Sequence, residues 1–333
     1  MTNRRQLDED DVRIRPSRTG SRPRSKSRPA HADSIAARVV TVDRGRFTCA
    51  LEDSGAEFYA IKARELGRKG IVVGDCVHVV GDVSGEDGSL ARIVRRDERT
   101  TVLHRTADDD DATERVIVAN ADTLVIVTAL ANPSPRPGLI NRFLIAAYTA
   151  DMTPVLVATK SDLASADDLH AAYDPLGLEI WVSAKGEDVA ELRQRLRGHT
   201  AVLVGHSGVG KSTLINALVP TSDRRVGEVN LVTGRGRHTS TNAEAIRFDD
   251  GWLIDTPGIR SFGLAHITPA QVIDSFEVLA DGAAHCPRGC THDEPECAID
   301  SHVADGHAGA HGPALLESVR QLMRSLSAAD SSA

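Results

Sequence analysis

The sequence has little of what membrane-spanning and secreted proteins need. No apolar run in its 333 residues approaches the roughly 20 residues that span a bilayer. Only five cysteines are present and no signal peptide is recognisable ahead of them, which disfavours a disulfide-based secreted scaffold. We therefore expect an intracellular, cytoplasmic protein without a membrane partner. The length and the 41% apolar content indicate more than one domain.

Net positive charge is also lacking, because acidic residues outnumber basic ones and the formal net charge is −8. On its own this value argues against a nucleic-acid partner. The basic residues are unevenly placed, however, since residues 13–28 carry seven Arg or Lys and no acid, interleaved with Ser and Pro. This composition predicts a disordered basic arm over residues 1–34. The arm either contacts RNA phosphates or is a solvating tail without a partner.

A glycine-rich segment fits the phosphate-binding P-loop pattern G-x-x-x-x-G-K-[ST]. Residues 201–204 before it predict a buried strand and residues 213–218 after it predict a helix, which is the context that the motif needs. Backbone N–H groups would surround phosphate oxygens at the positive end of the helix. Lys211 would reach the β- and γ-phosphates, and the Ser212 hydroxyl would bind Mg²⁺. The expected phosphate-binding residues are Gly205, His206, Ser207, Gly208, Val209, Gly210, Lys211, Ser212 and Thr213.

Two loops ahead of the P-loop favour guanine as the base. The first follows the apolar residues 154–158 and looks like the N-K-x-D motif of GTPases, with Thr159 where Asn is usual. The carboxylate of Asp162 is acceptor-only and matches the N1–H and amine donors of guanine. About 20 residues later, a second apolar strand leads into a loop that resembles the S-A-K loop behind the guanine ring. The expected base-binding residues are Thr159, Lys160, Asp162, Ser183, Ala184 and Lys185.

Two further segments downstream of the P-loop resemble the switches of GTPases. Asp255 and Gly258 form a D-x-x-G pattern after an apolar strand, where Asp255 would hold Mg²⁺ through its water shell and the Gly258 N–H would contact the γ-phosphate. Residues 234–241 are rich in Gly and Arg and predict a switch loop. Thr239 or Thr241 would close onto Mg²⁺ from this loop, and we favour Thr239.

The order of these motifs is unusual. The base-reading loops come first and the P-loop and switches follow, whereas ordinary GTPases begin with the P-loop. A doubly wound sheet tolerates such a circular permutation, because its sites lie at the carboxyl ends of its strands. The second switch then leads directly into the C-terminal segment.

That segment carries three cysteines and a histidine within twelve residues. A Cys3His set suits structural Zn²⁺, and the segment has few apolar residues with which to fold otherwise. Disulfides are the disfavoured alternative, and His285 is a competing ligand. The expected ligands are Cys286, Cys290, His292 and Cys297. More distant histidines, which a solvated polar loop explains better, are His302, His307 and His311. Cys49 and Cys76 lie in apolar strand patterns and are expected to be buried thiols.

The permuted motif order followed by the Cys/His cluster resembles the circularly permuted, ribosome small-subunit-dependent GTPases of the RsgA (YjeQ) family. The resemblance covers roughly residues 36–325. It implies a monomeric GTPase that binds the small ribosomal subunit and its 16S rRNA, and that couples GTP hydrolysis to late maturation of that subunit. No DNA partner is expected. Its cofactors would be GTP or GDP with Mg²⁺ and one structural Zn²⁺.

Catalysis needs a group that positions water, because Ile259 stands after D-x-x-G where many GTPases place Gln. His238 is the best candidate, since imidazole can accept or donate near neutral pH. We expect His238, Thr239 and Lys211 to be the catalytic residues. Arg235, Arg237 and Arg260 compete as charge stabilisers, and His238 contacting rRNA is the alternative role. Two other functions stay open: a GTP-gated RNA-binding or signalling module with negligible turnover, and an RNA-binding protein whose P-loop is only structural.

The pattern of the N-terminal region predicts a small barrel. Five or so short strands in about 60 residues, separated by Gly and Asp turns, suit a five-stranded barrel of the OB type. Phe47, Phe58 and Tyr59 would either stack on RNA bases or form its core. Four consecutive aspartates at residues 108–111 predict a solvated linker after it.

The expected architecture is thus multi-domain. It consists of the arm (1–34), an OB-like RNA-binding barrel (35–100), a circularly permuted α/β GTPase domain of the P-loop type (101–266) and a small α-helical zinc-binding segment (267–333). Apolar residues at helical spacing predict a closing helix in the last part. They are Leu315, Leu316, Val319, Leu322 and Met323.

Overall fold

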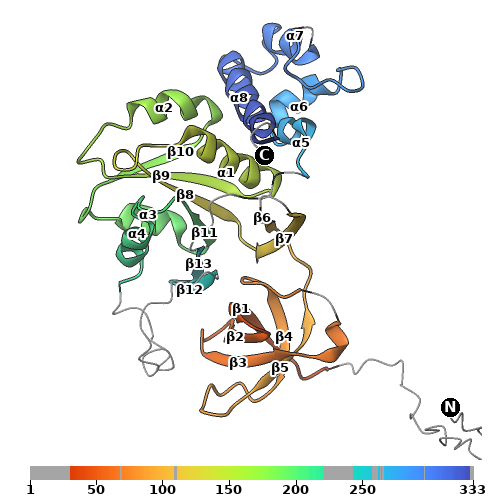
Figure 1. Ribbon diagram of the computed structural model, residues 1–333, viewed down its shortest axis with the longest axis vertical. Helices are drawn as coiled ribbons and strands as arrows, with labels where there is room; N and C mark the ends of the chain where they lie inside the picture. The colour runs from red at the N-terminus through yellow and green to blue at the C-terminus, as the bar shows by residue number, and fades with distance from the viewer. Residues whose placement is uncertain are drawn as a thin grey trace, which may run out of the picture. The chain divides into compact units, whose positions relative to one another are not determined.

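The computed structural model describes residues 31–67, 70–108, 111–220, 243–256, 262, 264, 266–295 and 297–330. The predicted basic arm up to residue 30, the catalytic candidates His238 and Thr239, and Gly258 lie outside the described residues. The described chain forms a barrel of strands, a sheet flanked by helices, and a helical C-terminal segment (Figure 1). In that part of the chain no helix combines the length and apolar character needed to cross a membrane.

The first five strands close into a barrel. β1 pairs with β2 and β4, β2 pairs with β3, and β5 completes the ring by pairing with both β3 and β4. Apolar side chains such as Val39, Phe58 and Ile93 fill the interior and are at most 2% exposed. Closure leaves the barrel without a free sheet edge. Its strands are β1 (Ile35–Asp43), β2 (Arg46–Leu51), β3 (Glu57–Lys62), β4 (Cys76–Gly81) and β5 (Ala91–Arg96), with the 3-10 turn η2 (Arg64–Leu66) between β3 and β4.

The aromatic side chains of the barrel decide between the two roles left open by the sequence. Phe47 and Phe58 lie in the core and are 5% and 2% exposed, so neither presents a ring to a base. Tyr59 is partly exposed. Cys49 is buried as expected, and burial raises the pKa of its thiol to about 12, whereas Cys76 is only partly buried.

A hairpin follows the barrel where the sequence suggested a linker. β6 (Val102–Asp108) and β7 (Asp111–Ala119) form a two-stranded antiparallel sheet, in which Asp108 pairs with Asp111. Asp108 and Asp111 therefore lie in strands. The linker prediction was wrong for these two residues because the flanking residues, rich in Val and Thr, form strands that reach them.

The central sheet is built from alternating strands and helices. Its strand order is β10-β9-β8-β11-β13-β12, with β12 antiparallel to β13 and the other neighbours parallel. The strands are β8 (Thr123–Ala129), β9 (Thr153–Thr159), β10 (Glu179–Ser183), β11 (Thr200–Val204), β12 (Glu244–Phe248) and β13 (Gly251–Asp255). The helices are α1 (Pro137–Thr149), α2 (Asp167–Tyr173), the 3-10 turn η3 (Asp174–Leu176), α3 (Ala190–Leu196) and α4 (Lys211–Leu218).

Both faces of this sheet are buried. On β8, Leu124 and Ile126 belong to the apolar cluster that includes residues of α1 and α2, whereas Val125 and Val127, which alternate with them, belong to the cluster that includes residues of α3 and α4. The two pairs of helices cover opposite faces of the sheet (Figure 1). This alternation is the two-residue period of a strand covered on both sides. The result is a doubly wound α/β domain, in which loops at the carboxyl ends of the parallel strands share one edge.

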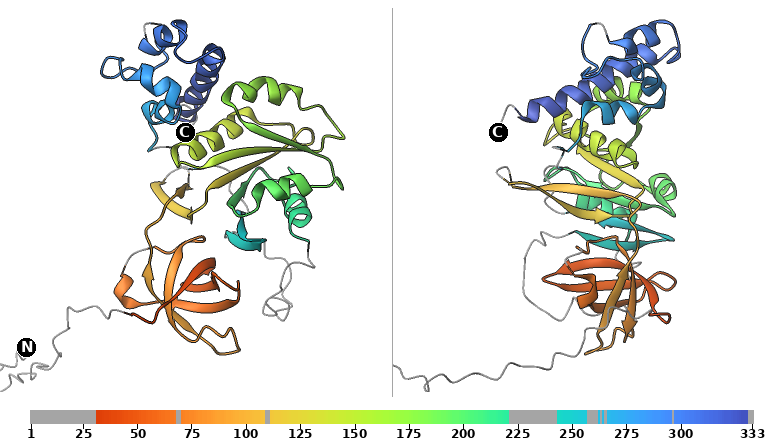
Figure 2. Two further views of the ribbon diagram at one scale, coloured as in Figure 1. Left: turned by 180° about the vertical axis from the view of Figure 1, so that it is seen from behind. Right: turned by 90° about the vertical axis from the view of Figure 1, so that its right-hand side faces the viewer.

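The C-terminal segment is helical and packs against α1. It contains α5 (Pro269–Asp274), α6 (Glu277–Ala283), α7 (Ala298–Ala304) and α8 (Gly312–Asp330), and α8 runs alongside α5 (Figures 1 and 2). The predicted apolar stripe of α8 is confirmed, since Val319 and Leu322 are at most 1% exposed. Phe262, ahead of this segment, packs edge-on against Phe143 of α1 with 5.3 Å between ring centroids, and Arg142 donates to its carbonyl oxygen.

Gly251 offers a test of how tightly β13 is held. A Cβ at this position would lie 2.1 Å from the carbonyl oxygen of His199, a backbone atom that cannot rotate away. Gly251→Ala should lower the free energy of unfolding by about 1–3 kcal/mol, the usual cost of overpacking. Gly138→Ala is the matched control, because a Cβ there meets nothing within 4 Å. Urea titrations that give both variants the same stability would contradict this packing.

Candidate functional site

The P-loop lies where the sequence predicts it. β11 ends at Val204, and α4 begins at Lys211 after Gly210, whose φ of +93° is left-handed. A Cβ on Gly205 would lie 2.4 Å from the carbonyl oxygen of Val127, so this position accepts only glycine. The strand, the tight turn and the helix N-terminus form the arrangement that binds phosphate groups.

Lys211 and Asp255 form an ion pair beside this loop. Lys211 Nζ lies 2.9 Å from Asp255 Oδ1 and donates to the carbonyl oxygen of Thr256 at 2.7 Å. The Thr256 hydroxyl donates to the carbonyl oxygen of Leu203 at 2.6 Å, which fixes the end of β13 against β11. Although the Lys211 ammonium is close, no group among the described residues donates a hydrogen bond of good geometry to the buried Asp255 Oδ1. A buried carboxylate oxygen that is not fully satisfied, next to a phosphate loop, suits a cation.

The two predicted base-reading loops are neighbours at the same edge of the sheet. β9 ends at Thr159 and β10 at Ser183, and the parallel register pairs these two residues. The Ser161 N–H donates to the carbonyl oxygen of Ser183 at 3.3 Å, which joins the loops. Asp162 is exposed, so its carboxylate is open to a ligand.

The first base-reading loop also contacts the P-loop. Lys160 Nζ donates to the carbonyl oxygen of Gly208 at 3.0 Å and to that of Asn132. The Thr159 hydroxyl lies 2.5 Å from the carbonyl oxygen of Val209. The structure therefore brings the predicted base and phosphate loops into direct contact.

Glu187 is a site residue that the sequence reasoning missed. Its Oε2 accepts a hydrogen bond from the Ala184 N–H at 2.6 Å, and its own N–H donates to the Ala184 carbonyl oxygen at 3.3 Å. Gly186 allows this tight turn with a φ of +89°. A carboxylate thus accepts a hydrogen bond from a backbone N–H of the predicted S-A-K loop. The Glu three residues after Ala184 was the only signal in the sequence.

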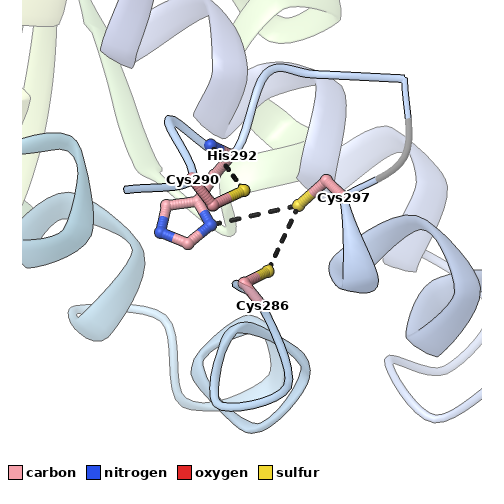
Figure 3. Close-up of side chains that lie close together, drawn as sticks. All are labelled: Cys286, Cys290, His292 and Cys297. Carbon is pink, nitrogen blue, oxygen red and sulfur yellow. Dashed lines mark hydrogen bonds between the residues drawn. The ribbon is translucent and has the colours of Figure 1, made fainter. Parts of the chain in front are cut away.

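A second site lies in the C-terminal segment, where four side chains converge (Figure 3). The ligand atoms of the four predicted residues all lie within 4.8 Å of one another. The sulfurs of Cys286 and Cys297 are 3.6 Å apart, and the Cys297 sulfur lies 3.9 Å from His292 Nδ1. Cys297 and His292 are 2% and 6% exposed. Three thiols and an imidazole at these distances could hold a metal ion.

Charged groups around the cluster hold its loop in place. Arg320 on α8 donates to the carbonyl oxygen of His292 at 2.9 Å and makes two bonds of 2.8 Å to Asp300. Arg324, also on α8, hydrogen bonds to Asp293 and so holds the pKa of that carboxyl below its usual value. Burial raises the pKa of the Cys297 thiol, so a metal ion would have to displace its proton.

The competing histidines do not join the cluster. His285 Nδ1 lies 3.2 Å from the carbonyl oxygen of Asp281, and His302 Nε2 lies 3.1 Å from that of Val278. In the part of the chain that the structure describes, the four predicted residues form the one group of this kind that could hold a metal ion. Cys286, Cys290, His292 and Cys297 are therefore brought together as expected.

Comparison with known proteins identifies the family. The sequence profile described as RsgA GTPase matches residues 96–265, a range that contains the P-loop and both base-reading loops. The chain belongs to the RsgA GTPase family.

RsgA proteins of Pseudomonas species are among the similar proteins. The small ribosomal subunit biogenesis GTPase RsgA of Pseudomonas putida is 40% identical over 254 residues, which are 73% of this chain and 72% of that protein. The protein of the same name from Pseudomonas aeruginosa is 43% identical over 225 residues, which are 64% of this chain. The match spans 65% of the length of the Pseudomonas aeruginosa protein.

Solved structures support the same fold. The crystal structure of YjeQ from Thermotoga maritima covers 88% of this chain and 98% of its own, with a TM-score of 0.63 and 26% identity. YloQ, described as a circularly permuted GTPase, covers 89% of this chain and 98% of its own, with a TM-score of 0.60 and 23% identity. The multi-domain fold expected from the sequence is thereby confirmed.

The four converging side chains generate a quantitative expectation. Chain purified without chelators should carry about one zinc ion, and Cys290→Ala should release it and unfold the C-terminal segment, since Cys290 is one of the four residues that could hold the ion. Cys76→Ala is the control, because Cys76 lies outside the cluster. Elemental analysis of both variants measures the ion. A wild-type chain without zinc, or a Cys290→Ala chain that keeps it, would contradict this assignment.

Proposed function

We propose that this chain hydrolyses GTP while bound to the small ribosomal subunit, and that hydrolysis is coupled to late maturation of that subunit. The observation that carries the proposal is the contact between base-reading loop and P-loop, in which Lys160 donates to the carbonyl oxygen of Gly208. This contact supports the proposal, because it joins the loop expected to read guanine to the loop expected to bind phosphate. The names of the Pseudomonas relatives support the ribosomal partner.

Recognition of GTP is divided among three loops. Asp162 would accept the two guanine hydrogen bonds, and Ser183, Ala184 and Lys185 would line the other side of the base. Glu187 must release the Ala184 N–H before that group can donate to the base. The backbone of the P-loop would surround the phosphates.

Lys211 and Asp255 would exchange partners when nucleotide binds. The Lys211 ammonium, now 2.9 Å from Asp255 Oδ1, would turn to the β- and γ-phosphates. Asp255 and the Ser212 hydroxyl would then hold Mg²⁺, which when bound neutralises charge on the transferred phosphoryl group. The incompletely satisfied Asp255 oxygen supports this role.

The hydrolytic step also needs residues that lie outside the described ranges. We assign Thr239 to the Mg²⁺ site, Gly258 to the γ-phosphate and His238 to the attacking water. The aliphatic Ile259 cannot orient water, so turnover without a partner should be slow. His238 directly precedes Thr239 in the sequence, so a loop that closes through Thr239 would also carry the imidazole of His238 inward.

The barrel would contact 16S rRNA through charge. Its phenylalanines are in the core, but five arginines among its described residues are exposed to solvent. Guanidinium groups bind phosphate oxygens without reading sequence. These residues are Arg44, Arg46, Arg64, Arg92 and Arg95. We also expect no DNA partner, a cytoplasmic location, a monomeric state and one structural Zn²⁺.

GTP hydrolysis with and without purified small subunits is the decisive experiment. We expect slow turnover of the free chain and a large stimulation by the subunits, while Lys211→Ala should abolish both because it removes the phosphate-binding ammonium. A chain that binds GTP but hydrolyses it negligibly under both conditions would instead be a GTP-gated binding module. The absence of GTP binding would leave the P-loop with a structural role only.

His238→Ala extends the same assay. If His238 positions the water, subunit-stimulated turnover should fall roughly 100-fold or more while binding of a non-hydrolysable GTP analogue stays unchanged. His311→Ala is a control for the loss of an exposed histidine outside the nucleotide loops and should leave turnover unchanged. Unchanged turnover together with weaker binding to the subunit would make His238 a docking residue.

Nucleotide choice depends on Asp162. Two mismatched hydrogen bonds at roughly 1–3 kcal/mol each imply a preference for GTP over ATP of roughly 30-fold or more. Asp162→Asn should erode this preference, since the amide presents N–H donors to the donors of guanine. Asp167→Asn removes an equally exposed carboxylate outside the loop and should leave the preference intact. Calorimetric titration that finds equal affinity for ATP and GTP in the wild-type chain would contradict the assignment.

A further inference from the structure

Thr159 is the last residue of β9, and its side chain contacts the backbones of Thr128 and Val209. Its side chain is buried, with the residue 9% exposed, and its hydroxyl oxygen lies 2.5 Å from the carbonyl oxygen of Val209 and 3.2 Å from that of Thr128. The side chain also covers Gly210, because a Cβ there would lie 3.4 Å from the Thr159 hydroxyl. Thr159 therefore contacts two consecutive residues of the P-loop.

The hydroxyl has only one proton to donate. Both neighbours of the hydroxyl are carbonyl oxygens, which only accept, and the shorter distance assigns the proton to Val209. Val209 is itself 3% exposed, so its carbonyl needs a partner from within the protein. Thr159 has no second proton with which to contact a base.

This bond also sets the direction of a neighbouring N–H group. The peptide between Val209 and Gly210 is planar, so its C=O and N–H point in opposite directions. Because Thr159 holds the carbonyl of Val209 on the side of β9, the N–H of Gly210 points away from β9. The N–H groups of the loop are the ones that a phosphate group needs.

We propose that Thr159 is a positioning residue, which orients the P-loop backbone for the phosphates of the nucleotide and does not read the base. This inference deepens the proposed GTP binding and rests on it. A side-chain amide at this position, as in the usual N-K-x-D motif, would bring two N–H donors and could serve both tasks. In this chain base selection is left to Asp162 and the S-A-K loop.

The test compares GDP with guanosine, which has the same base and no phosphate. Thr159→Val keeps the shape of the side chain and removes the proton, so GDP affinity should fall about tenfold, as expected for an orphaned buried carbonyl. Guanosine affinity, measured by ligand-observed NMR, should stay within twofold of wild type. Thr159→Ser retains the hydroxyl and should restore GDP affinity to within about threefold.

Thr123→Val is the matched control. Thr123 is fully buried in β8 and its hydroxyl donates to Asp122 at 2.6 Å, at the opposite end of the sheet. It should lower the melting temperature without changing GDP affinity, and this separates a loss of stability from a loss of positioning.

Three outcomes would overturn the inference: unchanged GDP affinity in Thr159→Val, an equal loss for guanosine and GDP, or a Thr159→Ser variant as weak as the valine variant. A wild-type chain that binds neither ligand would instead refute the proposed function, so the two failures are distinguishable.

Discussion

Parallel pairing of β8, β9, β10, β11 and β13 is the constraint on which the nucleotide site depends. The carboxyl ends of these strands meet at one edge of the sheet, so the loops that follow them converge although they are far apart in the sequence. Thr159, Ser183, Val204 and Asp255 each end such a strand. The order in which the chain visits the strands does not affect this convergence. A permuted sequence can therefore build the same site as an unpermuted one.

The sequence was sufficient where a short pattern requires a particular local structure. The P-loop was predicted from its glycines, because Gly205 and Gly210 occupy positions where a side chain is strained or blocked. The four residues that converge in the Cys/His cluster were predicted from their spacing. Alternation alone could not decide whether Phe58 faced the barrel interior or an RNA base, since both roles fit a strand that is covered on one side. The hairpin of β6 and β7 was missed because acidic residues are rare in strands.

Residues that hold their neighbours through hydrogen bonds left little signal in the sequence. Glu187 lies in a polar loop in which any acidic residue would be unremarkable, and its role appears only from its bond to Ala184. The same holds for Arg320 and Arg324. The apolar stripe of α8 predicted the helix but gave no reason for its polar face to hold the loop of the Cys/His cluster. Contacts of this kind depend on the relative placement of whole elements, which no local pattern encodes.

Phe262 gives α1 a second role besides covering the central sheet. Thr256, after the end of β13, is anchored to β11 through its hydroxyl, and Phe262 is anchored to α1 through its ring and its carbonyl oxygen. The same helix packs against α8. α1 is therefore a shared support, because the residue that precedes the C-terminal segment and the helix that closes that segment are held by one helix.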